Sequence, residues 1–302
     1  MRSSTPLTAP AETAEFARFA DYRELLKPGI ASFVVVMAAA SYLLGSDGTI
    51  VWKTLIGLMV GTGLTAGGAG TLNHVVERDL DARMGRTRQR PVSAGRVSPL
   101  AGALYGIGCA VAGAVVLALT TNPITTALSV LTVGLYVLVY TPLKQRTVHN
   151  TLVGAIPGAL PALGGVTAAT GSLNTTGWVL FGILFLWQLP HFYALAWVLR
   201  EDYQKGGFKM LPSARGGVRA TTSIALVSTL ALLVVGMLPG ATGAAGMLYL
   251  VGMAFIGVVF TIPAFSFYSE PNDERARRLF LTSVIWVPCF FALVVADVLL
   301  RW

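Results

Sequence analysis

Charged residues are scarce in this chain of 302 residues, where they make up 12% of the sequence. An ordinary soluble domain carries about 25%, so a chain that is 54% hydrophobic argues against a soluble globular protein. Cysteine is scarcer still, because only Cys109 and Cys289 occur and each lies inside a long apolar run. Neither a disulfide framework nor a cysteine-based zinc site is therefore expected.

Acidic residues are also few, with 14 Asp and Glu against 22 Lys and Arg, which gives a net charge of +8. On a soluble protein this excess would indicate a nucleic-acid partner. In an apolar chain it indicates instead the basic cytoplasmic loops of a membrane protein. We therefore expect a lipid bilayer, and no nucleic acid, as the surroundings of the chain.

Long apolar stretches dominate the remaining sequence, and each is long enough to cross about 30 Å of hydrocarbon. The sequence predicts an all-α, polytopic membrane protein with nine transmembrane helices, in which residues 28–302 form one domain and residues 1–27 a cytoplasmic segment. The nine stretches are residues 29–46, 54–76, 99–119, 123–141, 150–170, 176–199, 221–239, 245–265 and 277–300.

The connectors between these stretches differ in charge. Twenty of the 22 basic residues lie in the N-terminal segment and in residues 77–98, 142–149, 200–219 and 266–278. This asymmetry predicts a cell-membrane protein with a cytoplasmic N-terminus and an external C-terminus. Twelve of the 14 acidic residues share the basic side, which the positive-inside rule does not require. The cytoplasmic connectors are therefore expected to carry a functional site.

The N-terminal segment mixes acidic and basic residues, which suits neither a signal peptide nor an acid-poor transit peptide. Its apolar residues Phe16, Phe19, Leu25 and Leu26 predict an amphipathic helix that lies at the membrane interface.

The end of the second apolar stretch carries three oxygen-bearing side chains, Asn73, Glu77 and Asp81. On a helix they fall within an arc of about 80°, so they share one face. Carboxylates near the hydrocarbon are costly and commonly mark a cation or a function, and Mg²⁺ prefers oxygen ligands. A solvated helix end that merely stops the span is the alternative.

Arginines follow at once, in the run Arg86-Thr87-Arg88-Gln89-Arg90-Pro91. Guanidinium groups recognise phosphate in a bidentate manner. Carboxylates beside an arginine cluster favour a magnesium pyrophosphate site over a topology signal.

The pattern Asn-x3-Glu-x-Asp-x-Asp-x2-Met-x-Arg-Thr-x2-Arg-Pro, from Asn73 to Pro91, resembles the first acidic motif of the UbiA superfamily of intramembrane prenyltransferases. Glu77 stands where many members carry aspartate, and either carboxylate ligates Mg²⁺. Pro190-His191-Phe192 and the element from Asp202 to Pro212 resemble the branch that farnesylates haem. Gly206 stands where other members carry a second aspartate.

The resemblance implies a helical bundle around a central cavity that opens to the cytoplasm, and a reaction between farnesyl diphosphate and haem B that yields haem O and pyrophosphate. It implies Mg²⁺ as cofactor, and a haem A synthase or oxidase assembly factors as further partners. The implied metal ligands are Asn73, Glu77, Asp81 and Asp202; the implied pyrophosphate contacts are Arg86, Arg90, Lys144, Arg146 and Lys209; the implied haem-binding residue is His191.

Helical geometry places His191 about 20° around from Asp202 and about 16 Å deeper, if one helix contains both residues. Iron ligation is one interpretation of this histidine, and a core histidine bonded to a neighbouring helix is the other. Lys144 and Arg146 also fit an ordinary basic loop.

Three other functions stay open on the sequence alone. A prenyltransferase of the same superfamily that acts on a quinone precursor or a lipid would share the first acidic motif. A secondary transporter also has charged helix faces, but it would not need arginines beside the carboxylates. A structural partner in oxidase assembly would show no turnover.

Overall fold

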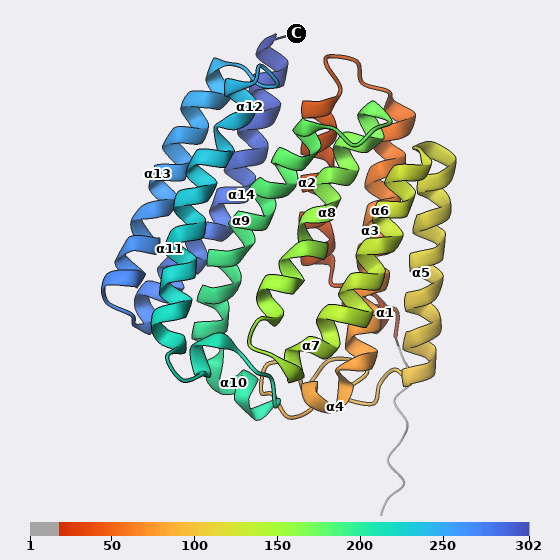
Figure 1. Cartoon of the computed structure of the whole chain (residues 1–302). Coiled ribbons are helices and arrows are strands. Elements are labelled where there is room, and N and C mark those ends of the chain that lie inside the picture. The colour runs from red at the N-terminus through yellow and green to blue at the C-terminus, as the bar shows by residue number, and fades with distance from the viewer. Residues whose placement is uncertain (1–17, 302) are drawn as a thin grey trace, which may run out of the picture.

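The structure, a computed structural model, describes residues 18–301. This part of the chain is a bundle of long helices joined by short connectors (Figure 1). The helices are α1 (Phe19–Leu25), α2 (Pro28–Gly45), α3 (Trp52–Val76), α4 (Arg78–Asp81), α5 (Pro99–Thr120), α6 (Pro123–Gly134), the π-helix η1 (Leu135–Tyr140), α7 (Thr141–Arg146), α8 (Asn150–Thr170), α9 (Thr175–Val198), α10 (Arg200–Lys205), the 3-10 helix η2 (Leu211–Ser213), α11 (Gly217–Gly236), α12 (Leu238–Ala241), α13 (Met247–Ser269) and α14 (Asp273–Arg301).

Nine helical segments within residues 18–301 are long and apolar enough to cross a membrane. The predicted number is confirmed, and the chain is a multi-pass membrane protein. One of the nine spans, residues 123–146, combines α6, η1 and α7. Because the number is odd, α1 lies at one end of the bundle and the last turn of α14 at the other (Figure 1).

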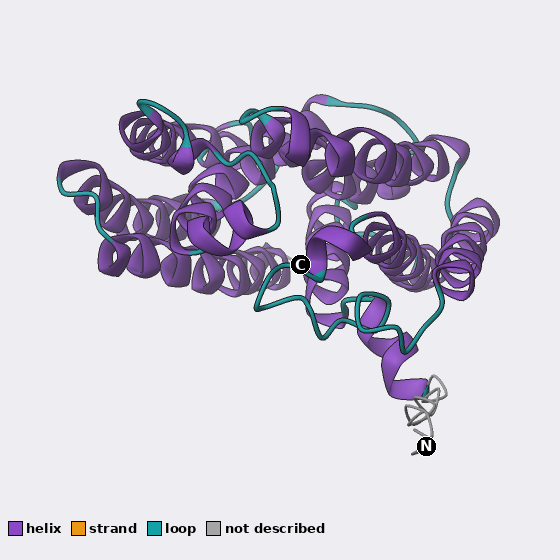
Figure 2. Ribbon diagram, turned by 90° about the horizontal axis from the view of Figure 1, so that it is seen from below, coloured by secondary structure: helices purple, strands orange, loops and turns teal. Residues whose placement is uncertain are grey.

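The short helices α4, α7 and α10 lie at the same end of the bundle as α1 (Figure 1). The end-on view in Figure 2 shows loops crossing this face. The connectors that hold most of the charge are thereby brought together, although they are far apart along the chain.

Close contact between α3 and α5 depends on glycine. A Cβ atom on Gly68 would lie 2.6 Å from the carbonyl oxygen of Gly106, and one on Gly113 would lie 2.6 Å from the carbonyl oxygen of Gly61. No side chain fits at such separations, so these glycines allow the two backbones to touch, as small residues do in membrane bundles. This contact fixes the position of α3, whose last turn carries Asn73.

The N-terminal helix α1 differs from the prediction. Leu25 is fully buried and packs with Val92 and Val97, and Asp21 accepts a hydrogen bond of 2.7 Å from Arg96 Nε. This bond holds the pKa of Asp21 below its ordinary value, and a hydrogen bond from the Arg18 backbone acts in the same direction. The predicted interfacial helix is wrong for Leu25, which the protein itself covers, whereas Phe19 is 86% exposed. Phe16 lies outside the described residues.

Asp297 is a buried carboxylate at the opposite end of the bundle. Its Oδ2 accepts from the backbone N–H of Gly246 at 2.8 Å and its Oδ1 from that of Tyr249 at 3.0 Å. The same side chain pairs with Arg301 at 3.0 Å. Asp297 therefore caps the N-terminus of α13 from α14, because the first N–H groups of a helix have no partner within it.

We expect Asp297→Ala to lower the free energy of unfolding by about 1–3 kcal/mol, since two buried N–H groups lose their acceptor. Thermal unfolding of the detergent-purified protein measures the change. Asp47→Asn is the control, because Asp47 is an exposed acid in the connector between α2 and α3. This substitution should change the free energy of unfolding by no more than about 0.5 kcal/mol. Equal stability of the two variants would contradict the capping role.

Candidate active site

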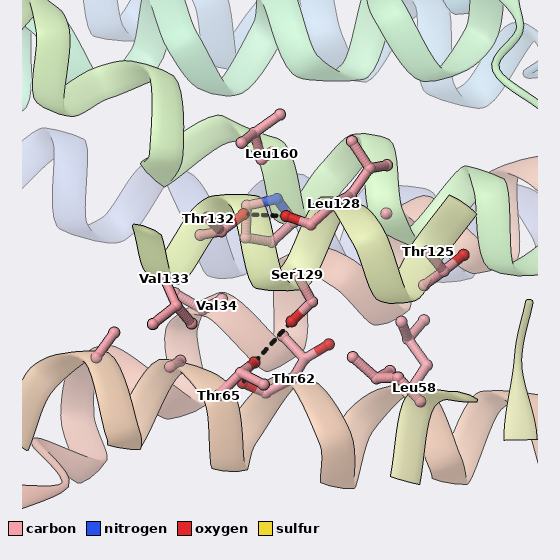
Figure 3. A pocket seen from close by; sticks show the side chains of 15 residues that line it. Val34, Leu58, Thr62, Thr65, Thr125, Leu128, Ser129, Thr132, Val133 and Leu160 are labelled. Atoms are coloured by element: carbon pink, nitrogen blue, oxygen red, sulfur yellow. Dashed lines mark hydrogen bonds between the residues drawn. The ribbon is translucent and has the colours of Figure 1, made fainter. Parts of the chain in front are cut away.

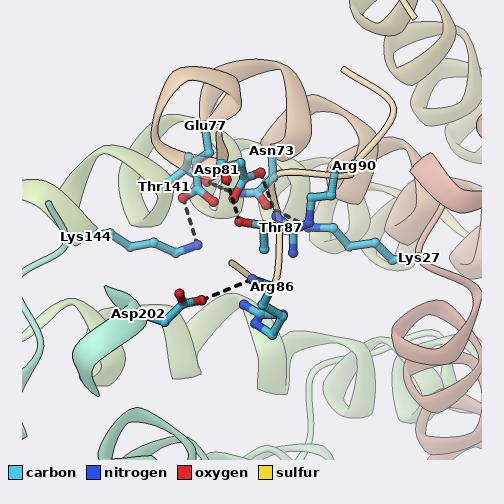
Figure 4. Close-up of polar contacts among 10 residues, drawn as sticks. All are labelled: Lys27, Asn73, Glu77, Asp81, Arg86, Thr87, Arg90, Thr141, Lys144 and Asp202. Carbon is cyan, nitrogen blue, oxygen red and sulfur yellow. Dashed lines mark hydrogen bonds and ion pairs between the residues drawn. The ribbon is translucent and has the colours of Figure 1, made fainter. Parts of the chain in front are cut away.

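The end of α3 carries the first group of predicted site residues. Helical hydrogen bonds continue past the end of α3, from Glu77 N to Asn73 O at 2.9 Å and from Asp81 N to Glu77 O at 2.8 Å. Asn73, Glu77 and Asp81 are 1%, 3% and 0% exposed, and Figure 4 shows them side by side. They are buried polar groups, so a solvated helix end does not describe them.

Each carboxylate of this group is paired with a cation. Lys144 Nζ on α7 lies 2.8 Å from Glu77 Oε1, and Arg90 Nη1 in the loop after α4 donates to Asp81 Oδ2 at 2.7 Å. Lys144 also lies over the ring of Tyr140, 4.8 Å from its centroid. The carboxylates are buried and the two cations partly buried, so removal of either cation would leave an uncompensated buried charge.

A third cation, Lys27, was not among the residues predicted from the sequence. Its Nζ donates to Asn73 Oδ1 at 2.7 Å, and its stem passes over Gly70 of α3. Lys27 lies between α1 and α2 with φ 49°, in the left-handed region. Burial lowers the pKa of Lys27 well below the usual range, and the charges of Arg90 and Lys144 lower it further. A strained lysine among other cations suggests a site for an anion.

A π-helix places Lys144 and Thr141. The Thr141 hydroxyl donates to the carbonyl of Tyr136, five residues earlier, at 2.8 Å, and accepts from Asn73 Nδ2 at 3.1 Å. Asn73 is therefore held through both of its amide atoms. π-Helical turns are rare and are frequent at functional sites.

The second acidic element occupies a separate place. Leu199 separates α9 from α10, so the condition of one helix that contains both His191 and Asp202 is not met, although Tyr203 N still donates to Leu199 O at 3.0 Å. Asp202 Oδ1 accepts from Gly85 N at 2.9 Å and Oδ2 from Arg86 N at 3.4 Å. Within residues 18–301, no three His, Cys, Asp or Glu side chains gather closely enough to hold a metal ion. Asp202 thus faces the loop after α4 across the site (Figure 4).

The remaining predicted pyrophosphate contacts lie at the rim. The side chains of Arg86, Arg146 and Lys209 are exposed. Lys209 Nζ donates to the carbonyl of Arg146 at 3.4 Å, and its backbone N–H donates to the carbonyl of Lys144 at 2.7 Å. The loop after α10 is thereby tied to α7, with both side chains near the entrance.

Several buried polar atoms at the end of α3 have no hydrogen-bond partner in the described part of the chain. They are both ring nitrogens of His74, Asp81 Oδ1 on the adjoining α4, and Glu77 Oε1, which is ion-paired with Lys144. Unpaired buried polar atoms cost about 1–3 kcal/mol each, so their concentration here indicates a bound polar ligand. An unpaired carboxylate oxygen beside Glu77 and Asn73 fits the oxygen donor set that Mg²⁺ prefers.

A small cavity of about 40 Å³ lies deeper in the bundle (Figure 3). Ala69, Thr62 and Leu58 on α3 line it, and they precede Asn73 by 4, 11 and 15 residues, which places all of them on one helix face. The hydroxyl groups of Thr65, Thr125, Ser129 and Thr132 bond within the protein, as Ser129 does to Thr65 at 2.9 Å. The surface of the cavity is therefore mostly apolar.

His191 lies in the other half of the bundle, on α9. Its Nδ1 is 2.7 Å from Ser283 Oγ on α14, and its ring stacks on Trp187 with centroids 5.1 Å apart. The side chain is partly exposed. The contact with a neighbouring helix matches one of the two interpretations of this residue, and the second ring nitrogen makes no hydrogen bond within residues 18–301.

The chain is similar in sequence to known proteins. The UbiA prenyltransferase family matches residues 33–293. A protoheme IX farnesyltransferase of Salinibacter ruber is 45% identical over 277 residues, which cover 92% of this chain and 98% of that protein. The human mitochondrial protoheme IX farnesyltransferase is 38% identical over 275 residues, covering 89% of this chain and 60% of the human protein.

Solved structures show the same fold at low sequence identity. A structure described for digeranylgeranylglyceryl phosphate synthase has a TM-score of 0.77 at 16% identity and covers 92% of this chain and 98% of that chain. A UbiA homologue from Archaeoglobus fulgidus bound to DMAPP and Mg²⁺ has a TM-score of 0.71 at 15% identity and covers 91% and 99%.

Proposed function

The chain belongs to the UbiA prenyltransferase family, and from this premise we propose that it transfers a farnesyl group from farnesyl diphosphate to a vinyl group of haem B. The products are haem O and pyrophosphate. The name of the relative that is 45% identical supports haem B as acceptor. Membership of a prenyltransferase family separates the chain from secondary transporters.

The proposal rests mainly on three cationic side chains that contact one buried cluster of two carboxylates and an amide. Lys144, Arg90 and Lys27 lie within 2.7–2.8 Å of Glu77, Asp81 and Asn73. Lys144 and Arg90 neutralise the two carboxylates, and Lys27 bonds the Asn73 amide. When a metal diphosphate binds, these cations would contact its oxygens and Glu77 and Asp81 would hold the metal.

Mg²⁺ fits the donor atoms of Asn73, Glu77 and Asp81, and it would supply positive charge against the diphosphate leaving group. The cations of the chain then orient the diphosphate and stabilise the charge that develops on it. We propose that Asp202 holds the loop after α4 over the site through Gly85 and Arg86, with Arg146 and Lys209 attracting the anion at the rim.

The bond changes follow from the substrates. The C–O bond of farnesyl diphosphate breaks and its electron pair leaves with the diphosphate, which produces an allylic cation. The terminal vinyl carbon of haem B forms the new C–C bond, and water adds to the resulting cation and loses a proton. Exclusion of bulk water by the bundle protects the allylic cation from early hydrolysis.

The farnesyl chain is proposed to run along the face of α3 into the apolar cavity. Burial of fifteen carbons is worth on the order of 10 kcal/mol at about 0.8 kcal/mol per methylene. Thr62 lines the deep part of the cavity, about 16 Å below Asn73 along the helix at 1.5 Å per residue.

We therefore expect Thr62→Phe to reduce kcat/KM for farnesyl diphosphate by about tenfold or more, because the ring fills space that the chain needs. Geranyl diphosphate, which is one isoprene unit shorter, should lose less than about threefold. Steady-state kinetics with both donors measures the ratio. Equal losses of kcat/KM for the two donors would show that the farnesyl chain does not reach Thr62.

The membrane orientation is a further part of the proposal. The charged end of the bundle, with α4, α7 and α10, faces the cytoplasm of the cell membrane, because it carries most of the basic residues. The C-terminal end of α14 then faces outside. A haem A synthase or an oxidase assembly factor as partner stays a prediction.

The proposed activity is tested in cells that lack haem O and that express the chain. Mass spectrometry of extracted haem is expected to show the farnesylated product only when the chain is present. If a quinone or a lipid were prenylated instead and haem B stayed unmodified, haem B would be the wrong acceptor. The assignment as a prenyltransferase would still hold.

A further inference from the structure

Ser283 on α14 makes two contacts with α9. Its hydroxyl oxygen lies 2.7 Å from His191 Nδ1, and its backbone carbonyl accepts from Trp187 Nε1 at 3.0 Å. Ser283 is itself fully buried. The serine therefore holds two neighbouring side chains of α9 through two different oxygens.

The direction of the bond to His191 follows from the number of hydrogens. A serine hydroxyl carries one hydrogen, and that of Ser283 is donated to the carbonyl oxygen of Phe280, one turn earlier on α14. Ser283 Oγ can then only accept from His191. The hydrogen of the neutral imidazole is therefore on Nδ1, and Nε2 carries the free lone pair.

The ring plane of His191 is fixed as well. Trp187 stacks on one side, with centroids 5.1 Å apart and planes 23° apart, and Phe280 contacts the ring at 4.9 Å and 32°. Nε2 lies on the edge of the ring away from Ser283 and makes no hydrogen bond within residues 18–301. The side chain is partly exposed. The structure thus presents an oriented nitrogen lone pair without a protein partner.

We propose that Ser283 is a positioning residue, which holds His191 in the Nδ1–H tautomer so that Nε2 ligates the iron of the haem substrate. The inference rests on the proposed function. It adds that Nε2 of His191 is the ligating atom and that Ser283 fixes the tautomer of that histidine. Histidine ligands generally donate their other N–H to a fixed acceptor, and loss of that acceptor commonly lowers metal affinity by about 10–100-fold.

The test uses the purified full-length protein, ferrous and ferric haem B, and no prenyl donor. Resonance Raman spectroscopy of the ferrous complex reports the iron–histidine stretch, which responds to the hydrogen bond at Nδ1, and absorption titration gives the haem affinity. We expect Ser283→Ala to shift this stretch and to weaken haem binding by about tenfold or more. Ser283→Thr, which keeps a hydroxyl, should show the iron–histidine stretch and the haem affinity of the unchanged protein.

Two comparisons separate positioning from a general loss of structure. In a His191→Ala background, Ser283→Ala should change haem affinity by less than about twofold, because the ligand on which it acts is gone. If Ser283→Ala leaves the wild-type stretch and affinity unchanged while His191→Ala removes the stretch, the positioning role is overturned and iron ligation stands. If the wild-type complex has no iron–histidine stretch, the inference is overturned, whereas prenyl transfer measured separately decides the proposed function.

Discussion

Asp81→Ala is expected to lower kcat/KM for farnesyl diphosphate by about 10²–10³-fold, which is the usual effect of removing one group that stabilises developing charge. The side chain is fully buried, with Oδ2 bound to Arg90 and Oδ1 unpaired among residues 18–301. Its removal deletes a proposed metal ligand and leaves the partly buried guanidinium of Arg90 without its partner. Steady-state kinetics at saturating haem B and varied Mg²⁺ measures the effect.

The matched control for this prediction is Asp79→Ala, on the same short helix. Asp79 is exposed and forms only a surface pair with Arg78 at 3.4 Å, a contact worth about 0–1 kcal/mol. Its loss should change kcat/KM by less than about twofold. Near-normal turnover of Asp81→Ala, with unchanged dependence on Mg²⁺, would remove Asp81 from the metal site.

Lys27→Met is expected to lower kcat/KM by about 10–100-fold, because it removes the cation on Asn73 and keeps the length of the side chain. A charge-assisted hydrogen bond contributes roughly 1.5–3 kcal/mol. The loss should appear in KM for farnesyl diphosphate and in binding of inorganic pyrophosphate with Mg²⁺, followed by calorimetry. Binding of haem B should stay unchanged.

Lys53→Met serves as the control for Lys27, since Lys53 is exposed on the first turn of α3 at the opposite end of that helix. Lys27→Arg keeps the charge and should recover part of the activity. If Lys27→Met bound pyrophosphate as tightly as the unchanged protein, the lysine would have a structural role at the corner between α1 and α2 only.

The sequence was sufficient to predict the nine spans and the shared face of Asn73, Glu77 and Asp81. Apolar length determines the spans, and a four-residue spacing places side chains on one helix face even where the helix is interrupted after Val76. Arg90 was predicted because it follows the carboxylates closely and belongs to a recognisable run of arginines.

Contacts between distant segments could not be predicted in the same way. Lys27 lies 46 positions before its partner Asn73, and in the sequence it resembles any basic residue that precedes a span. The one signal was its place directly before Pro28, where a helix begins. Ser283 lies 92 positions after His191 and is an ordinary serine until α9 and α14 are packed together.

The position of Asp202 was also beyond sequence reasoning. Helical periodicity assumes an unbroken helix from His191, whereas α9 and α10 are separate segments around Leu199 and Asp202 of α10 bonds to Gly85 and Arg86. A backbone N–H is a partner that no residue pattern identifies. The roles of Asp202, Arg146 and Lys209 therefore stay predictions.

The central claim is that this chain farnesylates haem B at the site around Glu77 and Asp81. The most direct measurement incubates the purified protein with haem B, farnesyl diphosphate and Mg²⁺ and follows the mass of the haem together with released pyrophosphate. We predict one pyrophosphate for each haem that gains a farnesyl group and one water, and product formation by Asp81→Ala that is slower by about 10²–10³-fold. Pyrophosphate release without a change in haem mass would contradict it.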